Sequence, residues 1–316
     1  MTAANSCIVL SEALAPAPMA AELIKHLPTY APNLVRYLDQ CQSKIVRPAL
    51  DQTRCTALEA WQVEQAGFPA ATAKHNAALA LLLASKAEKT ATIAPDKPFW
   101  LAELVHLAPS RDGAALIPAT DLQITPEQSH ELLNAAQLLC EGTGFRLEPW
   151  SAHHWQLHSA IELPAVFASP ALVSRSAVND WWDQNPATRE WRRFVNELQM
   201  LYFNHPVNQA RLHHGLPPIN SLWPVGGLAG NAWQPQPRPY QLFDTLTEPY
   251  LRQDWGLWLQ SLQQLDLELK TELSHQPDLV LTNTEQLLIA SPRPTRFWHR
   301  FMQPTSTWRS HWLVQS

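Results

Sequence analysis

Runs of apolar residues and their spacing divide the chain into three stretches of different character. The first stretch opens with a short apolar run, Cys7–Leu10, which is typical of a buried strand. A proline-rich loop follows, and helical patterns then continue to about Lys89. Among these, 57–65 and the alanine- and leucine-rich 71–86 are the strongest helix predictions. This stretch therefore predicts one strand followed by helices.

Between Phe99 and Ser159 the pattern changes to short alternating runs that are typical of strands. Two pairs of runs flank one helix, and the turn signal Arg111-Asp112-Gly113 joins the first pair. We predict a β-β-α-β-β module with strands over 105–107, 115–117, 145–147 and 155–157. We interpret residues 99–159 as a small α+β subdomain inserted into an α/β core formed by 1–98 and 160–316.

The helix of this module carries a complete start signal. Thr125 is placed to cap it, Pro126 suits the first helical position, and Gln128 completes a capping box. Leucines and alanines then recur on one face as far as Leu139, before glycines stop the helix.

The last stretch carries two amphipathic helix patterns. Asn185-Pro186 opens the first, and Pro206 is expected to end it. The second runs from about Asp254 to His275 and leads into a strand at 279–281. Strand, helices, inserted module, helix, loop, helix and strand together predict the α/β fold class.

Composition and charge exclude several classes of function. Of 316 residues, 46% are hydrophobic, as expected for a globular chain, and a net charge of -5 argues against bulk binding of nucleic acid or anionic membrane. The start, Met1–Leu10, lacks a basic region and a long apolar stretch, and no apolar run is long enough to span a bilayer. We therefore expect a cytoplasmic protein.

The four cysteines and the absence of several catalytic and nucleotide-binding motifs exclude further classes of function. Cys7, Cys41, Cys55 and Cys140 stand far apart, which predicts buried thiols in a reducing compartment and no metal site. The chain has no nucleophile elbow, no phosphate-loop lysine and no dinucleotide fingerprint. No cofactor is expected.

One segment, from His205 to Gly227, concentrates polar residues between prolines and glycines. We interpret it as a rigid loop, in which Arg211 offers a bidentate fork to an anion and the backbone at Gly226 and Gly227 can approach one. Alternatively, these residues have a structural role only, in which Asn208 and Asn220 cap turns and Trp223 fills the core.

This segment also carries a spaced motif over 205–226. It reads His-Pro-Val-Asn, two residues, Arg, three residues, Gly, two residues, Pro, one residue, Asn, two residues, Trp-Pro, one residue, Gly. The motif resembles that of archaeal-type cofactor-independent phosphoglycerate mutases, in the alkaline-phosphatase-like superfamily, and 104–157 is similar to their small inserted domain. A closer resemblance is to RpfE-type regulatory proteins of proteobacteria, through Val105–Leu107, Arg111-Asp112 and Asn196–Leu201. The resemblance covers roughly residues 99–227 and extends, more weakly, to the first strand and to the final helix and strand.

The resemblance implies a cleft at an end of the sheet that binds a small phosphorylated or carboxylate ligand. Its predicted lining is His205, Asn208, Arg211, Asn220, Trp223, Gly226 and Gly227.

The predicted function depends on the residues of the family pattern that this chain lacks. Enzymes of that superfamily hold two divalent metals with Asp and His ligands, because both oxygens of an in-line displacement must be stabilised. Here Ser11-Glu12 follow the first strand, the first aspartate is Asp39, 282–285 reads Thr-Asn-Thr-Glu, and no Asp-His pair occurs. We therefore predict a non-catalytic regulatory or anion-binding protein on a degenerate alkaline-phosphatase-like core, with no catalytic residues. The alternative is a metal-dependent phosphoglycerate mutase or phosphatase.

Two further groups of residues were weighed for binding. No nearby cysteine and no carboxylate partner supports a metal site at His153, His154 and His158, which are expected to be hydrogen-bonded surface or interface histidines. The segment 291–316 interleaves arginines and aromatic residues with no acidic residue. A second alternative is therefore an interaction protein that binds a partner through this segment. The structural alternative is that these residues cover the edge of the sheet.

Overall fold

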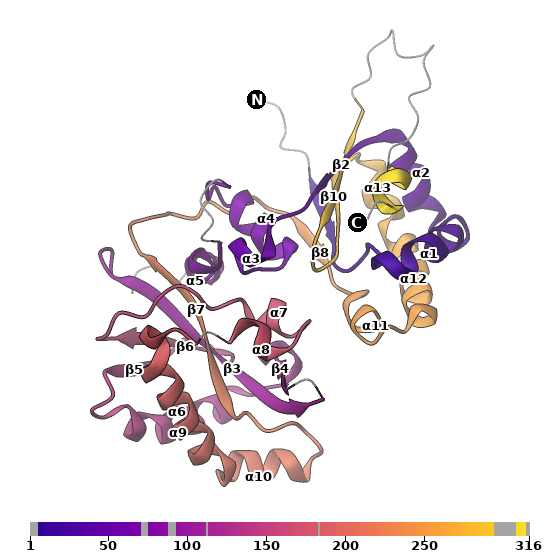
Figure 1. The fold of residues 1–316 in the computed structure, drawn as a ribbon. Helices are drawn as coiled ribbons and strands as arrows, with labels where there is room; N and C mark the ends of the chain where they lie inside the picture. The colour runs from indigo at the N-terminus through magenta and orange to yellow at the C-terminus, as the bar shows by residue number, and fades with distance from the viewer. Residues whose placement is uncertain are drawn as a thin grey trace. The chain divides into compact units, whose positions relative to one another are not determined.

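The strands of the described residues form two separate sheets, each with its own helices (Figure 1). A computed structural model describes residues 6–70, 75–87, 93–111, 113–182, 184–293 and 308–313. Its contacts divide the chain into two units: unit 1 comprises 1–49 and 238–316, and unit 2 comprises 50–237.

Unit 1 contains a mixed sheet in the order β2-β10-β9-β1-β8. β1 (Cys7–Leu10) lies between β8 (Gln241–Phe243) and β9 (Asp278–Thr282) and is parallel to both. β10 (Leu287–Pro292) runs antiparallel to β9 and to β2 (Cys41–Val46). The carboxyl ends of β1, β8, β9 and β2 therefore lie at the same edge of the sheet.

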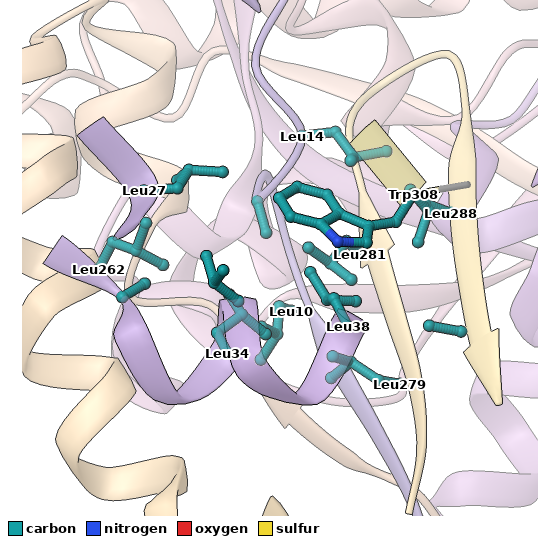
Figure 2. Packing of buried hydrophobic residues seen from close by; sticks show 14 of the residues in the cluster. Leu10, Leu14, Leu27, Leu34, Leu38, Leu262, Leu279, Leu281, Leu288 and Trp308 are labelled. Carbon is teal, nitrogen blue, oxygen red and sulfur yellow. The ribbon is translucent and has the colours of Figure 1, made fainter. Parts of the chain in front are cut away.

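The core of unit 1 lies between one face of this sheet and its helices. Leu10, Leu279, Leu281 and Leu288 pack against helical leucines and Trp308, as Figure 2 shows. The helices are α1 (Ala17–Tyr30), α2 (Pro32–Gln40), α11 (Thr247–Leu251), α12 (Trp255–Ser274) and α13 (Trp308–Leu313).

Unit 2 contains an antiparallel sheet in the order β4-β3-β6-β5, with β7 paired to β3. The long strand β3 (Pro98–Ser110) organises it: β7 (Ser221–Ala229) pairs with one part, and β6 (His154–Ser159) and β4 (Gly113–Ile117) pair with successive parts. β5 (Phe145–Pro149) pairs with β6.

Helices α6 (Pro126–Cys140) and α9 (Arg189–Phe203) share one apolar cluster with this sheet, in which Leu132, Phe145 and Phe194 are buried. A second cluster holds α4 (Ala57–Gln65) and α5 (His75–Lys86) against Phe99, Leu101 and Val225. The shorter helices are α3 (Leu50–Thr53), α7 (Pro170–Val173), α8 (Val178–Trp181), α10 (Pro206–His213) and the 3₁₀ turns Ala119–Asp121 and Pro186–Thr188.

The α/β class and most predicted elements are confirmed. The first strand, the β-β-α-β-β order, the helix after Thr125 and the final helix and strand all lie where expected. Unit 2 extends well beyond the predicted insertion of 99–159, because β7 pairs with β3 and α9 packs on the same cluster as α6.

The interpretation of 205–227 as a loop is wrong. Pro206 begins helix α10, and 221–229 is strand β7. Proline at the first helical position costs no hydrogen bond, since that N–H has no partner within a helix.

The described part of the C-terminal segment packs into unit 1. Trp308 and Trp312 are buried, Trp308 Nε1 donates to Asp39 Oδ1 at 2.8 Å, and Arg309 forms an ion pair with the same carboxylate. Residues 294–307 and 314–316, which carry most of the predicted arginine and aromatic pattern, lie outside the described residues.

The thiols match their prediction in part. Cys41 and Cys55 are buried, whereas Cys7 and Cys140 are half-buried, and none forms a disulfide. Burial raises the pKa of Cys41 to about 11, which disfavours the reactive thiolate. Among the described residues, none of the helices combines the length and hydropathy that a bilayer crossing requires.

Candidate functional site

His205 caps helix α10 in unit 2. Its Nδ1 accepts a hydrogen bond from the backbone N–H of Val207 at 3.3 Å, which requires Nδ1 to be unprotonated. Burial lowers the pKa of His205, although the carboxylate of Glu131 opposes this shift. Both observations favour a neutral imidazole that begins the helix.

Asn208 joins α10 to the segment that enters β7. Its amide group donates to the carbonyls of Tyr202 at 2.9 Å and Ile219 at 2.8 Å, and its Oδ1 accepts from the N–H of Ile219 at 2.8 Å. The side chain is fully buried, and both of its donors are used. Asn208 therefore holds the helix and the incoming strand together.

Arg211 is a buried cation with neutral partners. Its Nε donates to the carbonyl of Pro217 at 2.8 Å, one terminal nitrogen donates to Gln128 Oε1 at 2.7 Å, and the other to the carbonyl of Leu122. Burial lowers its pKa, but a guanidinium stays charged at neutral pH. None of the ion pairs among the described residues includes Arg211, so its charge is not neutralised by a carboxylate there.

Asn220 and Trp223 both stabilise the start of β7. Asn220 exchanges two hydrogen bonds with the backbone of Leu107, at 2.8 Å and 2.9 Å, and so extends the pairing with β3. Trp223 is fully buried and donates from Nε1 to the carbonyl of Ala168 at 2.7 Å. Trp223 and its neighbour Leu222 belong to different apolar clusters, as expected for opposite faces of a strand.

Gly226 and Gly227 permit β7 to lie close to β3. Both have φ above +100°, and a Cβ on Gly227 would lie 2.4 Å from the ring of Trp100. A Cβ on Gly226 would lie 2.6 Å from the carbonyl oxygen of Phe99, where the pairing register shifts. These conformations suit glycine alone.

The predicted ligand residues therefore divide into subgroups. Asn208 and Arg211 meet at 217–219, with Asn220 next in the chain. Gly226 and Gly227 lie six and seven residues beyond Asn220 along β7, which at the rise of a strand is about 20 Å away. The observed contacts give each residue a structural role, and ligand binding by the set stays a prediction.

The second candidate is the carboxyl edge of the sheet in unit 1. The N–H of Glu12 donates to Thr282 Oγ1 at 3.2 Å, and the Ser11 and Thr247 hydroxyls lie 3.3 Å apart. Ser11, Glu12 and Thr282 are all buried, and Glu12 has a left-handed φ of 53°. Trp258 also donates to the carbonyl of Glu12 at 2.9 Å, so the turn after β1 is held from two sides.

Asn283 and Gln286 close the turn between β9 and β10 at the same edge. Asn283 Oδ1 accepts from the N–H groups of Glu285 and Gln286, at 3.0 Å and 2.9 Å. Gln286 Oε1 accepts from Arg47 Nε at 2.9 Å. Hydroxyl and amide groups at this edge thus bond to one another and to backbone.

The predicted absence of a carboxylate beside the histidines of β6 is wrong. His158 Nε2 lies 2.9 Å from Glu148 Oε2, and His154 Nε2 lies 3.4 Å from Glu103 Oε2. Strand pairing places these groups together, because Glu103 is opposite His154 in register. Within the described ranges, no three or more His, Cys, Asp or Glu side chains are arranged to hold a metal ion.

Sequence reasoning missed a half-buried carboxylate in unit 2, that of Glu59. Glu59 Oε2 accepts hydrogen bonds from the N–H and hydroxyl of Thr56, both at 2.9 Å, and from Ser169 Oγ at 2.5 Å. Burial raises the pKa of Glu59, and the hydrogen bonds and Arg175 oppose this shift. The capping-box spacing of Thr56 and Glu59 is a signal that could have identified it.

Comparison with known proteins gives a distant similarity in fold. No family model and no curated protein matches the chain. A cofactor-independent phosphoglycerate mutase from Thermoplasma acidophilum is 13% identical, with 92% of this chain and 91% of that chain covered and a TM-score of 0.37. The PH0037 protein from Pyrococcus horikoshii is 11% identical, with 92% and 87% covered and a TM-score of 0.39.

Proposed function

We propose that this chain is a non-catalytic, cytoplasmic regulatory protein of the RpfE type that binds an anionic ligand on a phosphoglycerate mutase-like scaffold. The observation that carries the proposal is the bonding at the carboxyl edge of the unit 1 sheet. There the Glu12 N–H is bonded to the Thr282 hydroxyl, and Asn283 is bonded to its own turn.

This bonding disfavours phosphoryl transfer. A two-metal site needs several carboxylates or imidazoles directed at one point, because the metals neutralise the charge that develops on the entering and leaving oxygens. Hydroxyl and amide side chains are weak ligands for such ions, and those at this edge already donate to or accept from protein groups. Glu12 supplies one buried carboxylate at this edge, where a two-metal site needs several anionic or imidazole ligands.

The anion-binding part of the proposal is supported by Arg211. Its buried positive charge has neutral hydrogen-bond partners, so the surrounding segment has a positive potential that favours an anion. His205 and Asn220 lie near it in the chain and could add polar contacts.

The ligand test uses 3-phosphoglycerate and inorganic phosphate as separate probes. We expect a millimolar concentration of at least one to raise the unfolding temperature of the wild-type chain, because a ligand that binds only the folded state stabilises it. Arg211→Lys should abolish this rise, whereas the exposed control Arg193→Lys should retain it. A rise that is equal in both variants, or absent from the wild type, would exclude anion binding at Arg211.

A further inference from the structure

The C-terminal half of α9 exposes large apolar side chains. Met200 is 79% exposed, Phe203 75% and Leu201 39%, although the opposite face of the same helix is buried in the unit 2 core. The positions 200, 201 and 203 form a broad outward face at the last turn of the helix. Amphipathic helices normally place polar residues there, so these side chains need another explanation.

The exposed face continues onto α10. Leu212 is 54% exposed and lies one turn after Gln209, whose side chain donates to the carbonyl of Phe203 at 3.2 Å. This hydrogen bond brings the outer side of α10 next to the end of α9. We name Met200, Leu201, Phe203 and Leu212 the α9–α10 surface.

The segment that carries this surface exposes no acidic residue, lysine or arginine. Residues 199–215 contain no Asp, Glu or Lys, and the single arginine, Arg211, is buried. Charged residues make up 16% of the whole chain, so this stretch is locally depleted of charge. Depletion of charge together with Met and Phe is the composition of the central part of a protein–protein interface.

We propose that the α9–α10 surface associates with the same surface of a second copy of this chain, as a two-fold dimer. At about 200 Å² for a large side chain, the four apolar residues expose roughly 500 Å² in each copy. A standard interface takes about 800 Å² from each partner, which the intervening Gln199, Asn204 and Gln209 can complete.

Self-association fits this surface better than a charged partner does. In a two-fold dimer the same patch meets itself, so any exposed charge would meet a like charge near the axis. None of the four residues of the α9–α10 surface is charged, and the charged residues that precede it on α9, Arg193 and Glu197, pair with each other at 2.9 Å, so little repulsion is expected. The surface offers no electrostatic recognition to an acidic or basic partner.

The test is sedimentation velocity of the full chain between about 1 and 50 µM, a range suited to a standard-sized interface. We expect dimers in the wild type, and at least a tenfold weaker association in Phe203→Asp and Leu212→Asp, since each places a charge against its own copy. Leu267→Asp is the matched control, because Leu267 is 62% exposed on α12. Circular dichroism confirms that each variant is folded.

A wild type that stays monomeric throughout this range would overturn the proposal. So would dimers that persist in both surface variants, or that dissociate equally in the Leu267 control. Flotation with phosphatidylcholine vesicles by a monomeric wild type would assign the surface to a membrane and equally overturn it.

Discussion

The N–H of Glu12 and the hydroxyl of Thr282 are joined by a hydrogen bond of 3.2 Å across the carboxyl edge of the unit 1 sheet. Glu12 follows β1 and Thr282 ends β9, and the two strands are parallel neighbours. The turn that leaves β1 with a left-handed Glu12 is therefore fixed by a side chain of the next strand.

Thr282→Val tests this relationship. Valine keeps the shape of threonine but leaves the buried N–H of Glu12 without its acceptor, so we expect a loss of about 1–2 kcal/mol in unfolding free energy. Urea unfolding measures this loss. Thr282→Ser retains the hydroxyl and should be less destabilised; a valine variant as stable as the serine variant would contradict the assignment.

Asn208→Ala should destabilise unit 2 by about 2–3 kcal/mol, because it removes three hydrogen bonds and leaves both backbone groups of Ile219 without their buried partner. Its neighbour Gln209 is exposed, and Gln209→Ala should cost less than about 1 kcal/mol. Similar unfolding midpoints for the two variants would show that Asn208 does not hold α10 to β7.

Comparing Gly227→Ala with Gly215→Ala separates two causes of lost stability. One is the clash of an added Cβ with a neighbouring side chain, and the other is the backbone strain of a residue with positive φ. Both glycines have positive φ, but only at Gly227 would a Cβ meet the ring of Trp100, since nothing lies within 4 Å of one at Gly215. We expect about 1 kcal/mol of destabilisation at Gly215 and at least about 2 kcal/mol more at Gly227. Thermal unfolding of the pair checks this order, and equal losses would show that Trp100 moves aside freely.

The raised pKa of the half-buried Glu59 predicts that the stability of the chain depends on pH. Its pKa is raised in the folded state, so the folded chain retains a proton that the unfolded chain has already released. The stability this proton contributes is complete below the usual carboxyl pKa and is lost as pH rises through the raised value. Relative to Glu59→Gln, the wild type should therefore lose unfolding free energy as pH rises from about 4 towards neutrality. A difference that is independent of pH, or that grows in the opposite direction, would contradict this.

The sequence predicted correctly those elements that are stabilised by residues close together in the chain. The capping box of Thr125 and Gln128 is present with both of its hydrogen bonds, and the helix extends to Cys140 as expected. The helix expected to end at Pro206 does end before it, at Phe203, but the helix α10 that Pro206 begins was not predicted. Proline is compatible both with the end of one helix and with the first turn of the next. Strand β7 was missed because Pro224 and two glycines disfavour a strand locally, whereas pairing with β3 stabilises it.

The candidate site depended on contacts that the sequence could not show. Arg211 is bonded to Leu122 and Gln128, which are 89 and 83 residues away in the chain. The terminal nitrogens of Arg211, predicted as a bidentate fork, donate to these protein oxygens, and anion binding at Arg211 stays a prediction. The residues after β1 and β9 were singled out by the family resemblance, and they lie at one edge of the unit 1 sheet because these two strands are parallel neighbours.

A coupled assay of phosphoglycerate interconversion, with manganese, zinc or magnesium supplied, tests whether the chain is non-catalytic. We expect no turnover above background with any of these ions. Glu12 contributes one buried carboxylate to the edge after β1, and among the described residues no three His, Cys, Asp or Glu side chains are arranged to hold a metal ion. Metal-dependent turnover that disappears in Ser11→Ala would contradict this expectation and would establish an active phosphoglycerate mutase.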